Sequence, residues 1–373
     1  MTTIAPTRYP RRQRSLKIVS VATGCAIGLL CGEIGARTFA WLREASKRSD
    51  FERMRTGPSA LRLDREAKLG EIVCPSAFDD VIYELIPSCS ALFQGVPCSF
   101  NADGYRGPPL PARKREPGSL RIVGLGDSVM FGWGIDEPDC FLRRIERTLR
   151  ARMPERLVEV VNTGVPGYNT AMEVAAFEHK TLSLRPDVIL IDWVGNDADL
   201  PNLVATDSSP FDLSRSFLYD LTRKALGWRT QWQTGPLQEA PFTGEHYERD
   251  PARVPTAYRG MVGEAGVERA LRRLAELAEQ HGFRVVVTSH YGVPEFVRQC
   301  CQKHQWPVLD SVDQVHAALR ERGLEPADYR RSDLVLGPED PHPSARAHAM
   351  YAERLANFLQ QLGWLAPAAI NPR

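Results

Sequence analysis

The sequence predicts an α/β protein built on a parallel β-sheet that is covered by helices on both faces, and two observations carry this prediction. From residue 120 onward, short continuous runs of Val, Ile and Leu alternate with longer segments of helical periodicity. Continuous apolar runs are typical of strands that are buried on both faces of a parallel sheet. Strands that are joined by helices imply right-handed crossovers, so we expect a doubly wound, three-layer α/β/α sandwich with five strands.

The expected elements succeed one another from residue 120 to residue 362. The expected strands are Leu120–Gly124, Val158–Asn162, Val188–Trp193, Arg284–Ser289 and Val308–Asp310. The expected helices are Phe141–Arg152, Thr170–Leu182, Val267–Gln280, Pro294–Gln305, Val312–Arg322 and Ala345–Leu362. One helix shows its pattern clearly, because Leu271, Leu274 and Leu277 recur at helical spacing with charged residues on the opposite side.

The composition excludes some classes of function but does not identify a single one. The chain has 373 residues, a 43% apolar content and a formal net charge of +1, so we expect one catalytic-sized domain with appendages and no nucleic-acid partner. The eight cysteines include no Cys-x-x-Cys pair, and His290, His304 and His342 lack ligand spacing, so neither a metal nor another cofactor is expected. Cys89 and Cys98 flank a short loop and are candidates for a disulfide in an oxidising compartment.

The first 42 residues have the pattern of a membrane anchor. Residues 1–17 carry five basic residues and no acidic one, and the apolar run that starts at Ile18 continues past Glu33 and Arg37 to residue 42. This run exceeds the roughly 20 residues that a bilayer needs, and its two charges are four residues apart, so they can pair on one helix face. The basic flank predicts a cytoplasmic tail (1–17), a signal anchor (18–42) and an exported remainder.

Two other interpretations are open for this segment. A basic region followed by an apolar run also describes a cleaved signal peptide, but no clean small-x-small cleavage site follows the apolar run. The pair Arg11-Arg12 is compatible with a twin-arginine export signal, although the residues after it fit that signal poorly. We therefore favour an uncleaved anchor.

Two further segments flank or interrupt the expected sheet. Residues 43–118 show no sustained alternation and end in a proline-rich basic stretch, so we expect a linker or wrapping arm before a domain at 119–366. Residues 101–107 of this arm are rich in turn-forming residues, and we call them the turn-rich island. This island is either a surface turn or a point where Tyr105 and Arg106 dock onto the domain. An insertion at 199–255 is either a lid or substrate-binding cap, or a decorated loop. Its aromatic residues include Phe211, Phe217, Tyr219, Trp228, Trp232, Phe242 and Tyr247.

The first expected strand leads into Gly126-Asp127-Ser128, which brings a serine into a tight turn before a helix. In open α/β sheets ligands bind at the carboxyl ends of the strands, so this serine is a candidate nucleophile. A serine hydroxyl is a weak nucleophile and needs a base, usually histidine, that is oriented by an acid. Two carboxylates, Glu339 and Asp340, stand just before His342 and ahead of the last expected helix.

Two loops at other strand ends offer donors for an oxyanion. The second strand leads to Gly167, where a backbone N–H can approach a ligand because no Cβ intervenes. The third strand leads to Asn196, whose amide is a further donor at the same sheet edge. Taken singly, such residues are more often structural: Asn196 can turn the chain, and Ser344 can cap the final helix beside a solvated His342. Four such blocks in order at the ends of one sheet are much less expected by chance.

The four blocks resemble those of the SGNH hydrolases, also called GDSL-type esterases and lipases. The matching segments are Gly126-Asp127-Ser128, Asn162 to Gly167, Gly195-Asn196-Asp197 and the block around His342. The resemblance implies a five-stranded, flavodoxin-like sheet, with Ser128 as nucleophile, His342 as base, and Gly167 and Asn196 in the oxyanion hole. The island before the domain and the charged pair in the apolar run also look like features of membrane-anchored bacterial members.

One residue departs from the family pattern. The family places an aspartate three residues before the histidine, and Glu339 stands there in this chain, whereas Asp340 stands two before. The spacing slightly favours Glu339 as the residue that orients His342. Pro341 restricts the backbone of Asp340 to extended conformations, which limits where its carboxylate can point. Both carboxylates are therefore candidates.

Three functions are compatible with these residues. The first is a membrane-anchored serine esterase that cleaves carboxylic esters, with O-acetyl groups on envelope glycans or lipids as candidate substrates. The second is a cell-envelope O-acyltransferase, because water and an alcohol attack the same acyl-serine. The third is a non-catalytic binding module on the same scaffold. The expected partners are a small-molecule, lipid or glycan ester and the membrane, with the catalytic domain on the periplasmic or cell-surface side.

Overall fold

The computed structural model confirms the expected fold class. It describes residues 11–56, 62–112, 116–206, 211–213, 215–225 and 248–365. Its largest sheet has five parallel strands in the order β10-β9-β8-β6-β7. The first of these strands along the chain therefore lies between the second and the third, which is the strand order of flavodoxin-like folds.

The five strands are the apolar runs that the sequence predicts. They are β6 (Leu120–Leu125), β7 (Val158–Asn162), β8 (Val188–Asp192), β9 (Arg284–Ser289) and β10 (Val308–Asp310). β6 lies between β7 and β8, where Gly124 pairs with Asn162 on one side and with Leu190 on the other. This register ends three neighbouring strands at nearly the same level, so the loops that follow them meet at one edge of the sheet.

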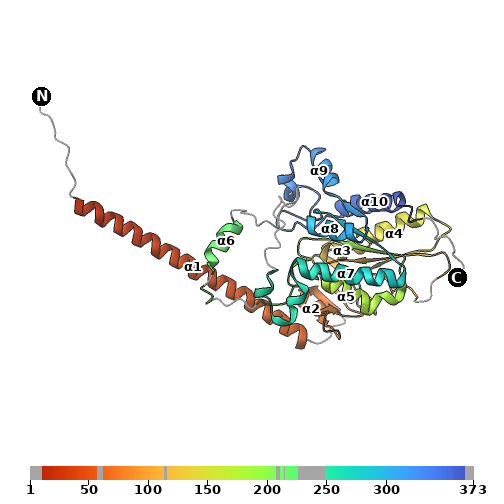
Figure 1. Cartoon of the computed structure of the whole chain (residues 1–373), viewed down its shortest axis with the longest axis horizontal. Helices are drawn as coiled ribbons and strands as arrows, with labels where there is room; N and C mark the ends of the chain where they lie inside the picture. The colour runs from red at the N-terminus through yellow and green to blue at the C-terminus, as the bar shows by residue number, and fades with distance from the viewer. Residues whose placement is uncertain are drawn as a thin grey trace, which may run out of the picture. The chain divides into compact units, whose positions relative to one another are not determined.

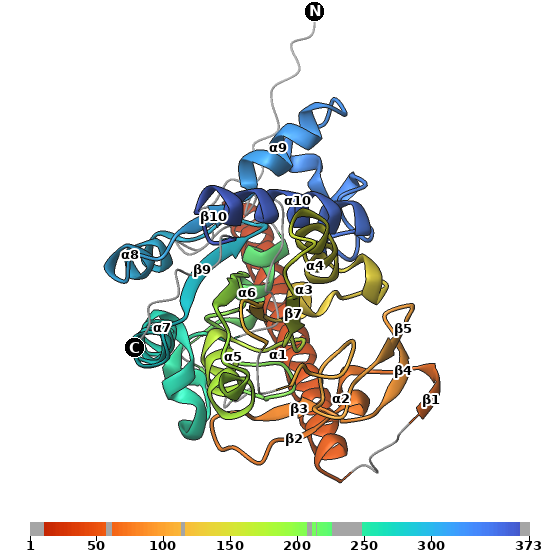
Figure 2. The ribbon, with the colours of Figure 1, turned by 90° about the vertical axis from the view of Figure 1, so that its right-hand side faces the viewer.

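Helices cover both faces of this sheet (Figures 1 and 2). One face carries α4 (Phe141–Arg152) and α10 (Ala345–Gln361), and the other carries α5 (Thr170–Ala176), α7 (Gly263–His281) and α8 (Glu295–Lys303). Successive residues of a strand point to opposite faces, so Ile122 packs in the core under α4 and α10, and Val123 packs in the core under α5 and α7. Two cores explain why the strands are apolar over most of their length.

Two further helical segments belong to this domain. α5 is followed by a π-helical turn at Phe177–Thr181, and together they occupy nearly all of the expected helix at 170–182. α9 (Val312–Arg320) packs with Tyr329 and Leu334 in a smaller cluster. The expected helix bounds are thus met to within a few residues.

The arm before the domain is folded, although the sequence predicts a linker or wrapping segment at 43–118. Residues 62–112 form α2 (Leu69–Ile72) and five short strands in two small sheets. The strands are β1 (Arg62–Glu66), β2 (Val73–Pro75), β3 (Tyr83–Leu85), β4 (Ser90–Phe93) and β5 (Val96–Ser99). Strands this short are hard to recognise from a repeating apolar pattern, which is why the sequence does not reveal them.

A shared hydrophobic core joins the arm to the main sheet. Tyr83, Leu85 and Phe93 of the arm are fully buried and lie in one cluster with Val165 and Tyr168, which follow β7. The ring of Tyr83 meets the ring of Tyr168 edge-on, with centroids 5.3 Å apart. Arm and sheet therefore belong to one folded unit.

Cys89 and Cys98 lie in this same core. Cys98 pairs with Ala91 across the β4–β5 hairpin, and the carbonyl of Cys89 accepts a hydrogen bond from the backbone N–H of Phe100. Both cysteines are present as thiols rather than as the disulfide that their spacing allows. Burial raises the pKa of each thiol, which keeps both sulfurs in the less reactive protonated form.

The N-terminal helix and part of the insertion form a separate unit, made of residues up to Ser46 together with 208–229. α1 (Arg11–Thr56) is one continuous helix, and its segment Lys17–Met54 is long and apolar enough to cross a membrane, with a mean hydropathy of 1.8 in its most apolar window. By length and composition it is a candidate for the expected anchor.

The insertion is described only in part. It contains α6 (Phe217–Ala225), which belongs to the same unit as the first part of α1. The aromatic residues Trp228, Trp232, Phe242 and Tyr247 lie outside the described residues.

The folded arm gives a first prediction. Phe93→Ala removes a fully buried ring from the core that arm and sheet share, so the free energy of unfolding should fall by about 3–5 kcal/mol. Leu92→Ala is the matched control, because Leu92 precedes Phe93 in the same strand and is 38% exposed. The control should change the free energy by only about 0.5 kcal/mol. Urea unfolding followed by circular dichroism measures both, and equal small losses would mean that the arm adds nothing to the core.

Candidate active site

Ser128 opens the first helix after β6. It begins α3 (Ser128–Phe131), and Asp127 is the residue that caps this helix. The Asp127 carboxylate accepts a hydrogen bond from the backbone N–H of Val129 at 3.1 Å, which fixes the turn. A Cβ on Gly126 would come within 2.6 Å of an α3 side chain, so glycine lets the helix fold back closely on the strand. The triplet thus ends a strand and presents a serine, as the sequence predicts.

The imidazole of His342 reaches this serine. Its Nε2 lies 2.9 Å from Ser128 Oγ, and its Nδ1 lies 2.6 Å from Oδ1 of Asp340. An ionised carboxylate only accepts hydrogen bonds, so Nδ1 carries the proton and Nε2 presents its lone pair to the serine hydroxyl. Acid, base and nucleophile therefore form one line of hydrogen bonds, which is the arrangement that a serine nucleophile requires.

Asp340, and not Glu339, contacts the imidazole. The spacing favours Glu339, but in the structure Glu339 is exposed and Asp340 is the hydrogen-bond partner of His342. The reason is local, because Asp340 Oδ1 also accepts the backbone N–H of His342 at 3.1 Å, which closes an Asx-turn across Pro341. Such a turn joins a side chain to the residue two positions later. An acid two residues before the histidine is thereby folded onto its ring.

The Asp340 carboxylate is held in its ionised form. Burial alone would raise its pKa, but hydrogen bonds and charge from His342, together with a hydrogen bond from Trp133, outweigh burial and lower the pKa below its ordinary value. The indole Nε1 of Trp133 donates to Oδ2 at 3.0 Å. Each oxygen of this carboxylate thus has a donor.

Trp133 is a site residue that sequence reasoning misses. Besides its hydrogen bond to Asp340, its ring stacks on the imidazole of His342, with centroids 4.9 Å apart and planes inclined by 16°. Phe93 of the arm meets the indole edge-on, with centroids 5.1 Å apart. No motif marks a tryptophan in this position, and its closeness in sequence to Ser128 is the only signal that points to it.

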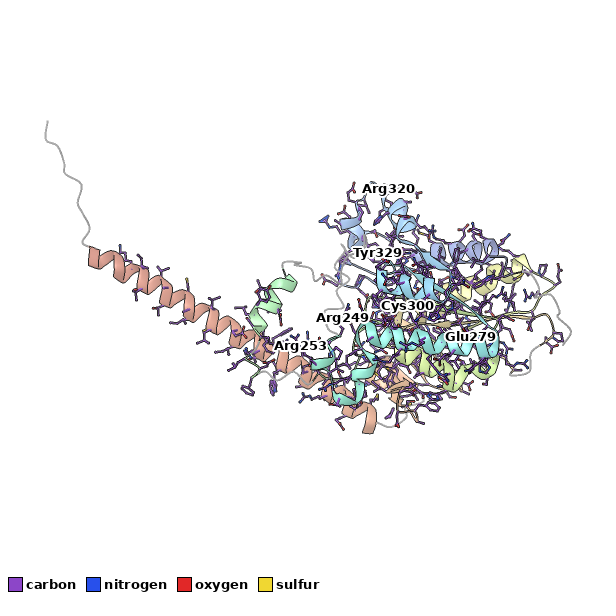
Figure 3. All side chains as sticks on the ribbon, viewed as in Figure 1. Arg249, Arg253, Glu279, Cys300, Arg320 and Tyr329 are labelled. Atoms are coloured by element: carbon purple, nitrogen blue, oxygen red, sulfur yellow. The ribbon has the colours of Figure 1, made fainter. Side chains whose placement is uncertain are left out.

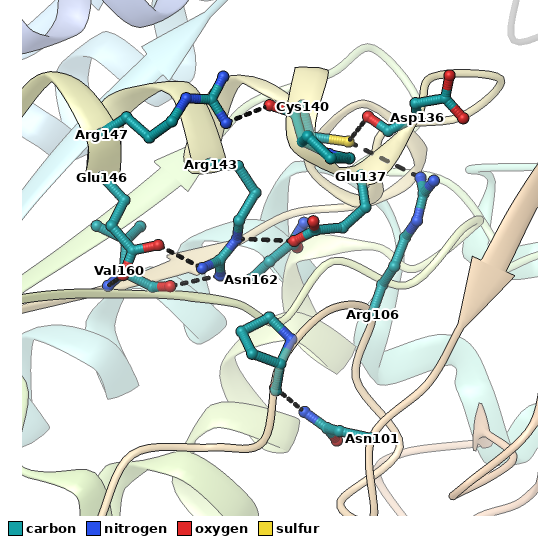
Figure 4. Close-up of polar contacts among 12 residues, drawn as sticks. Asn101, Arg106, Asp136, Glu137, Cys140, Arg143, Glu146, Arg147, Val160 and Asn162 are labelled. Atoms are coloured by element: carbon teal, nitrogen blue, oxygen red, sulfur yellow. Dashed lines mark hydrogen bonds and ion pairs between the residues drawn. The ribbon is translucent and has the colours of Figure 1, made fainter.

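Arg106 of the arm holds the segment that carries Trp133. It is buried, and its guanidinium donates to the carbonyl oxygens of Gly132 and Ile135, each at 2.6 Å. Sγ of Cys140 lies 3.8 Å from the same group (Figure 4). Of the two interpretations of the turn-rich island, docking is the correct one. The arm thereby supports the residue that donates a hydrogen bond to the Asp340 carboxylate.

The glycine loop after β7 runs beside the serine turn. The backbone N–H of Val165 donates to the carbonyl of Gly126 at 3.2 Å. Gly167 has a φ of 78°, and a Cβ there would lie 2.3 Å from Asn202. The left-handed backbone and the close approach both require glycine at this position. Its N–H is therefore a candidate oxyanion donor, as the sequence predicts.

Asn196 reaches the serine turn from the end of β8. Its amide donates to Oδ2 of Asp127 at 2.8 Å, and a primary amide has a second N–H that is able to serve an oxyanion. Ser128 Oγ also lies 3.2 Å from Asp127 Oδ2. Burial raises the pKa of Asp127, although these hydrogen bonds and that of Val129 act in the opposite direction. Asp127 thus links Ser128 to the loop of Asn196.

Arg249 holds that loop from the other end of the insertion (Figure 3). Its guanidinium pairs with Asp199 at 2.7 Å and donates to the carbonyl of Gly195 at 3.1 Å. Burial raises the pKa of Asp199 to about 6, against the effect of this cation. The start and the end of the insertion are therefore tied together next to Asn196.

Other polar residues near the strand ends have structural contacts. His290 is buried with Nε2 3.1 Å from the hydroxyl of Tyr329, and burial lowers its pKa to about 3. Ser344 caps α10 by accepting the N–H of Ala347 at 3.4 Å. Within the residues that the structure describes, no three His, Cys, Asp or Glu side chains converge in a way that would hold a metal ion.

The chain matches one known protein family in sequence and is similar to several solved structures. The model of the GDSL-like lipase/acylhydrolase family matches residues 125–350. Similar solved structures include a protein titled as lipolytic, of the G-D-S-L family, from Desulfitobacterium hafniense (TM-score 0.37, 14% identity, 64% of this chain and 99% of that one). Others are a lipase/acylhydrolase from Enterococcus faecalis (0.38, 16%, 67% and 99%) and the acetylxylan esterase Axe2 from Geobacillus stearothermophilus (0.37, 17%, 66% and 95%). No curated protein matches the chain.

The position of the acid gives a prediction with an internal control. Asp340→Asn should slow labelling of Ser128 by a fluorophosphonate by up to ~10⁴-fold, because an amide no longer holds the imidazole in the required tautomer. Glu339→Gln should be labelled at nearly the rate of the unmodified protein, since the imidazole is bonded to Asp340. Mass spectrometry at several reaction times measures both rates. If Glu339→Gln is labelled slowly and Asp340→Asn is labelled fast, Glu339 is the acid that orients His342.

Trp133→Phe keeps an aromatic ring beside His342 and removes the indole N–H. Loss of this donor makes the Asp340 carboxylate more basic, so the acid side of the pH–rate profile should move to higher pH. The maximal labelling rate should fall by about tenfold, because losses of this size are typical when a hydrogen-bond partner that orients a reactive residue is removed. Trp306→Phe is the control, because Trp306 also lies beside a histidine, His304, with centroids 5.1 Å apart. An unshifted profile in Trp133→Phe would show that the indole N–H does not tune the acid.

Proposed function

The chain belongs to the GDSL-like lipase/acylhydrolase family and is an ester hydrolase of the SGNH type, and on this premise we propose that it is a membrane-anchored serine esterase. The observation that carries the proposal is the line of hydrogen bonds from Asp340 through His342 to Ser128. Its three members come from two ends of the domain. The fold brings them within hydrogen-bond distance of one another.

Each residue has one part in the proposed reaction. Ser128 Oγ attacks the ester carbonyl carbon while its proton passes to Nε2 of His342, and a tetrahedral oxyanion forms. Asp340 keeps the imidazole in the required tautomer and stabilises the imidazolium. The N–H groups of Ser128 and Gly167 and the second amide N–H of Asn196 donate to the oxyanion. The imidazolium protonates the leaving alcohol, and water then cleaves the acyl-serine with the same base, which releases the acid.

The proposed substrates are carboxylic esters at the membrane surface, with O-acetyl groups on envelope glycans or lipids as the first candidates. The supporting observation is the long apolar helix before the domain, which would hold the enzyme next to such esters. The basic N-terminal tail places the catalytic domain on the extracytoplasmic side in this proposal. An acyltransferase would use the same acyl-serine with a sugar hydroxyl in place of water.

Ser128→Ala tests the proposed nucleophile. The full chain in detergent should hydrolyse a short p-nitrophenyl ester, and the variant should lose this activity to the level of the buffer, because the acyl intermediate forms on Ser128 in the proposed mechanism. Ser90→Ala is the matched control, since Ser90 contributes its hydroxyl to the exposed side of the β4–β5 hairpin. Far-ultraviolet circular dichroism checks that both variants are folded. If Ser128→Ala still hydrolyses the ester, the proposed mechanism is wrong.

A substrate panel separates hydrolysis from transfer. Acetylated glycans and short lipid esters are offered with and without a sugar acceptor, and acetic acid and new esters are quantified. A hydrolase releases acetic acid at the same rate in both conditions. An acyltransferase forms a new ester that depends on the acceptor and on Ser128.

A further inference from the structure

Glu33 of the anchor helix binds the first turn of the helix in the insertion. Its carboxylate accepts hydrogen bonds from the backbone N–H groups of Phe217 and Leu218, at 3.0 and 2.9 Å. The hydroxyl of Ser216 donates to the same carboxylate at 2.7 Å. The first N–H groups of a helix have no partner inside the helix, and a negative charge there is favourable. Glu33 therefore caps α6 from a distant part of the chain.

Arg37 completes this contact. Its guanidinium donates to the carbonyl oxygens of Asp212 and Arg215 at 2.8 and 2.9 Å, and it pairs with Glu33 at 2.8 Å. It also lies over the ring of Phe217, 4.8 Å from the centroid, and that ring is 5% exposed. The two charges of the anchor thus pair with each other, as the sequence predicts, and also bind the insertion. We call Glu33 and Arg37 the clamp.

Small residues let α6 approach α1 beside the clamp. A Cβ on Gly32 would lie 3.0 Å from the side chain of Leu218, and Ala36 is buried. Gly32, Glu33, Ala36 and Arg37 occupy one side of α1, because residues four apart on a helix share a face. Membrane-spanning helices typically place small residues where a second helix approaches closely. They also turn their charged side chains toward that helix and away from lipid.

The clamp lies at a definite level of the anchor. At about 1.5 Å per residue, Glu33 stands about 24 Å and Arg37 about 30 Å along α1 from Lys17, the last basic residue of the tail. The hydrocarbon core of a bilayer is about 30 Å thick. With Lys17 at one boundary of this core, the clamp lies near the opposite boundary, where headgroups meet the acyl chains.

The segment that the clamp holds exposes large apolar side chains. Phe211 is 85% exposed and Leu213 is 90% exposed, and Tyr219 and Leu221 of α6 are 57% and 44% exposed. A group of apolar side chains with this exposure is typical of a surface that contacts another phase or partner.

We propose that residues 211–225 are a second membrane contact, an interfacial segment that the clamp fixes to the anchor at the boundary opposite the basic tail. Its occupant is the bilayer that holds α1, since the exposed apolar side chains continue those of the anchor, where Phe39 and Trp41 are 57% and 53% exposed. This inference rests on the proposed anchor.

Photo-cross-linking in vesicles tests the inference. Full-length protein with benzoylphenylalanine in place of Leu213 is reconstituted into vesicles of phosphatidylcholine and phosphatidylglycerol, irradiated, and analysed for lipid adducts by mass spectrometry. Position 213 should give about tenfold more lipid adduct than position 157, because an interfacial side chain lies among lipid headgroups and acyl chains. Leu157, an exposed leucine of the main domain, is the matched control. Ile27, in the apolar part of α1, is the positive control.

A second variant tests the clamp itself. In the chain that also carries Glu33→Ala and Arg37→Ala, the adduct at position 213 should fall by about fivefold, because the first turn of α6 loses its cap and its contacts to the anchor. The adduct at position 27 should stay the same. Hydrolysis of the p-nitrophenyl ester shows that each variant is folded.

The outcomes separate the inference from the proposal on which it rests. Adducts at position 27 without adducts at position 213 would overturn the interfacial segment and leave the anchor in place. Adducts at neither position would overturn the anchor as well. Cross-links from position 213 to a second copy of the chain in place of lipid would also contradict the inference.

Discussion

The level at which three neighbouring strands end determines where the serine turn, the glycine loop and the Asn196 loop of the proposed site lie. Gly124 of β6 pairs with Asn162 of β7 and with Leu190 of β8, so the segments that follow leave the sheet side by side. A shift of one residue in this register would turn each strand's side chains to the opposite face and separate the two cores from their helices. Backbone pairing therefore brings the serine turn, the glycine loop and the Asn196 loop together. Side-chain bonds, such as that of Asn196 to Asp127, then fix their final distances.

Local patterns made most of this fold predictable. Val158–Asn162 and Phe141–Arg152 have the same bounds in the structure as in the sequence analysis, because a continuous apolar run and a helical stripe are complete within a few turns of chain. The arm could not be predicted in this way. Its strands are short, and its core depends on residues that are far away in sequence, as when the hydroxyl of Tyr168 donates to the carbonyl of Tyr83, 85 positions earlier. Contacts between residues far apart in the chain produce no repeating pattern of apolar residues in the sequence.

The same distinction applies to the site. Ser128 and His342 stand in short motifs, and the structure brings them to within 2.9 Å of each other. Both carboxylates before His342 are candidates for the acid from the sequence, and spacing slightly favours Glu339, whereas an Asx-turn folds the side chain of Asp340 onto the ring. Trp133 and Arg249 could not be found by motif or by period, whereas Arg106 stands in the turn-rich island as a residue that could dock onto the domain. All three act through contacts between separate parts of the fold: Trp133 with Asp340, Arg106 with the segment that carries Trp133, and Arg249 with the loop of Asn196.

The contacts of Phe93 and Arg106 also determine where this polypeptide can be divided. The family pattern starts at residue 125, but the segment that carries Trp133 is packed and hydrogen-bonded from residues upstream of that start. A piece that begins with the pattern would contain Ser128, His342 and Asp340 without the residues that support Trp133. The N-terminal unit combines residues up to Ser46 with residues 208–229 of the insertion. An engineered exchange of the N-terminal helix would therefore have to include that part of the insertion, whereas residues 62–112 have to stay with the main sheet.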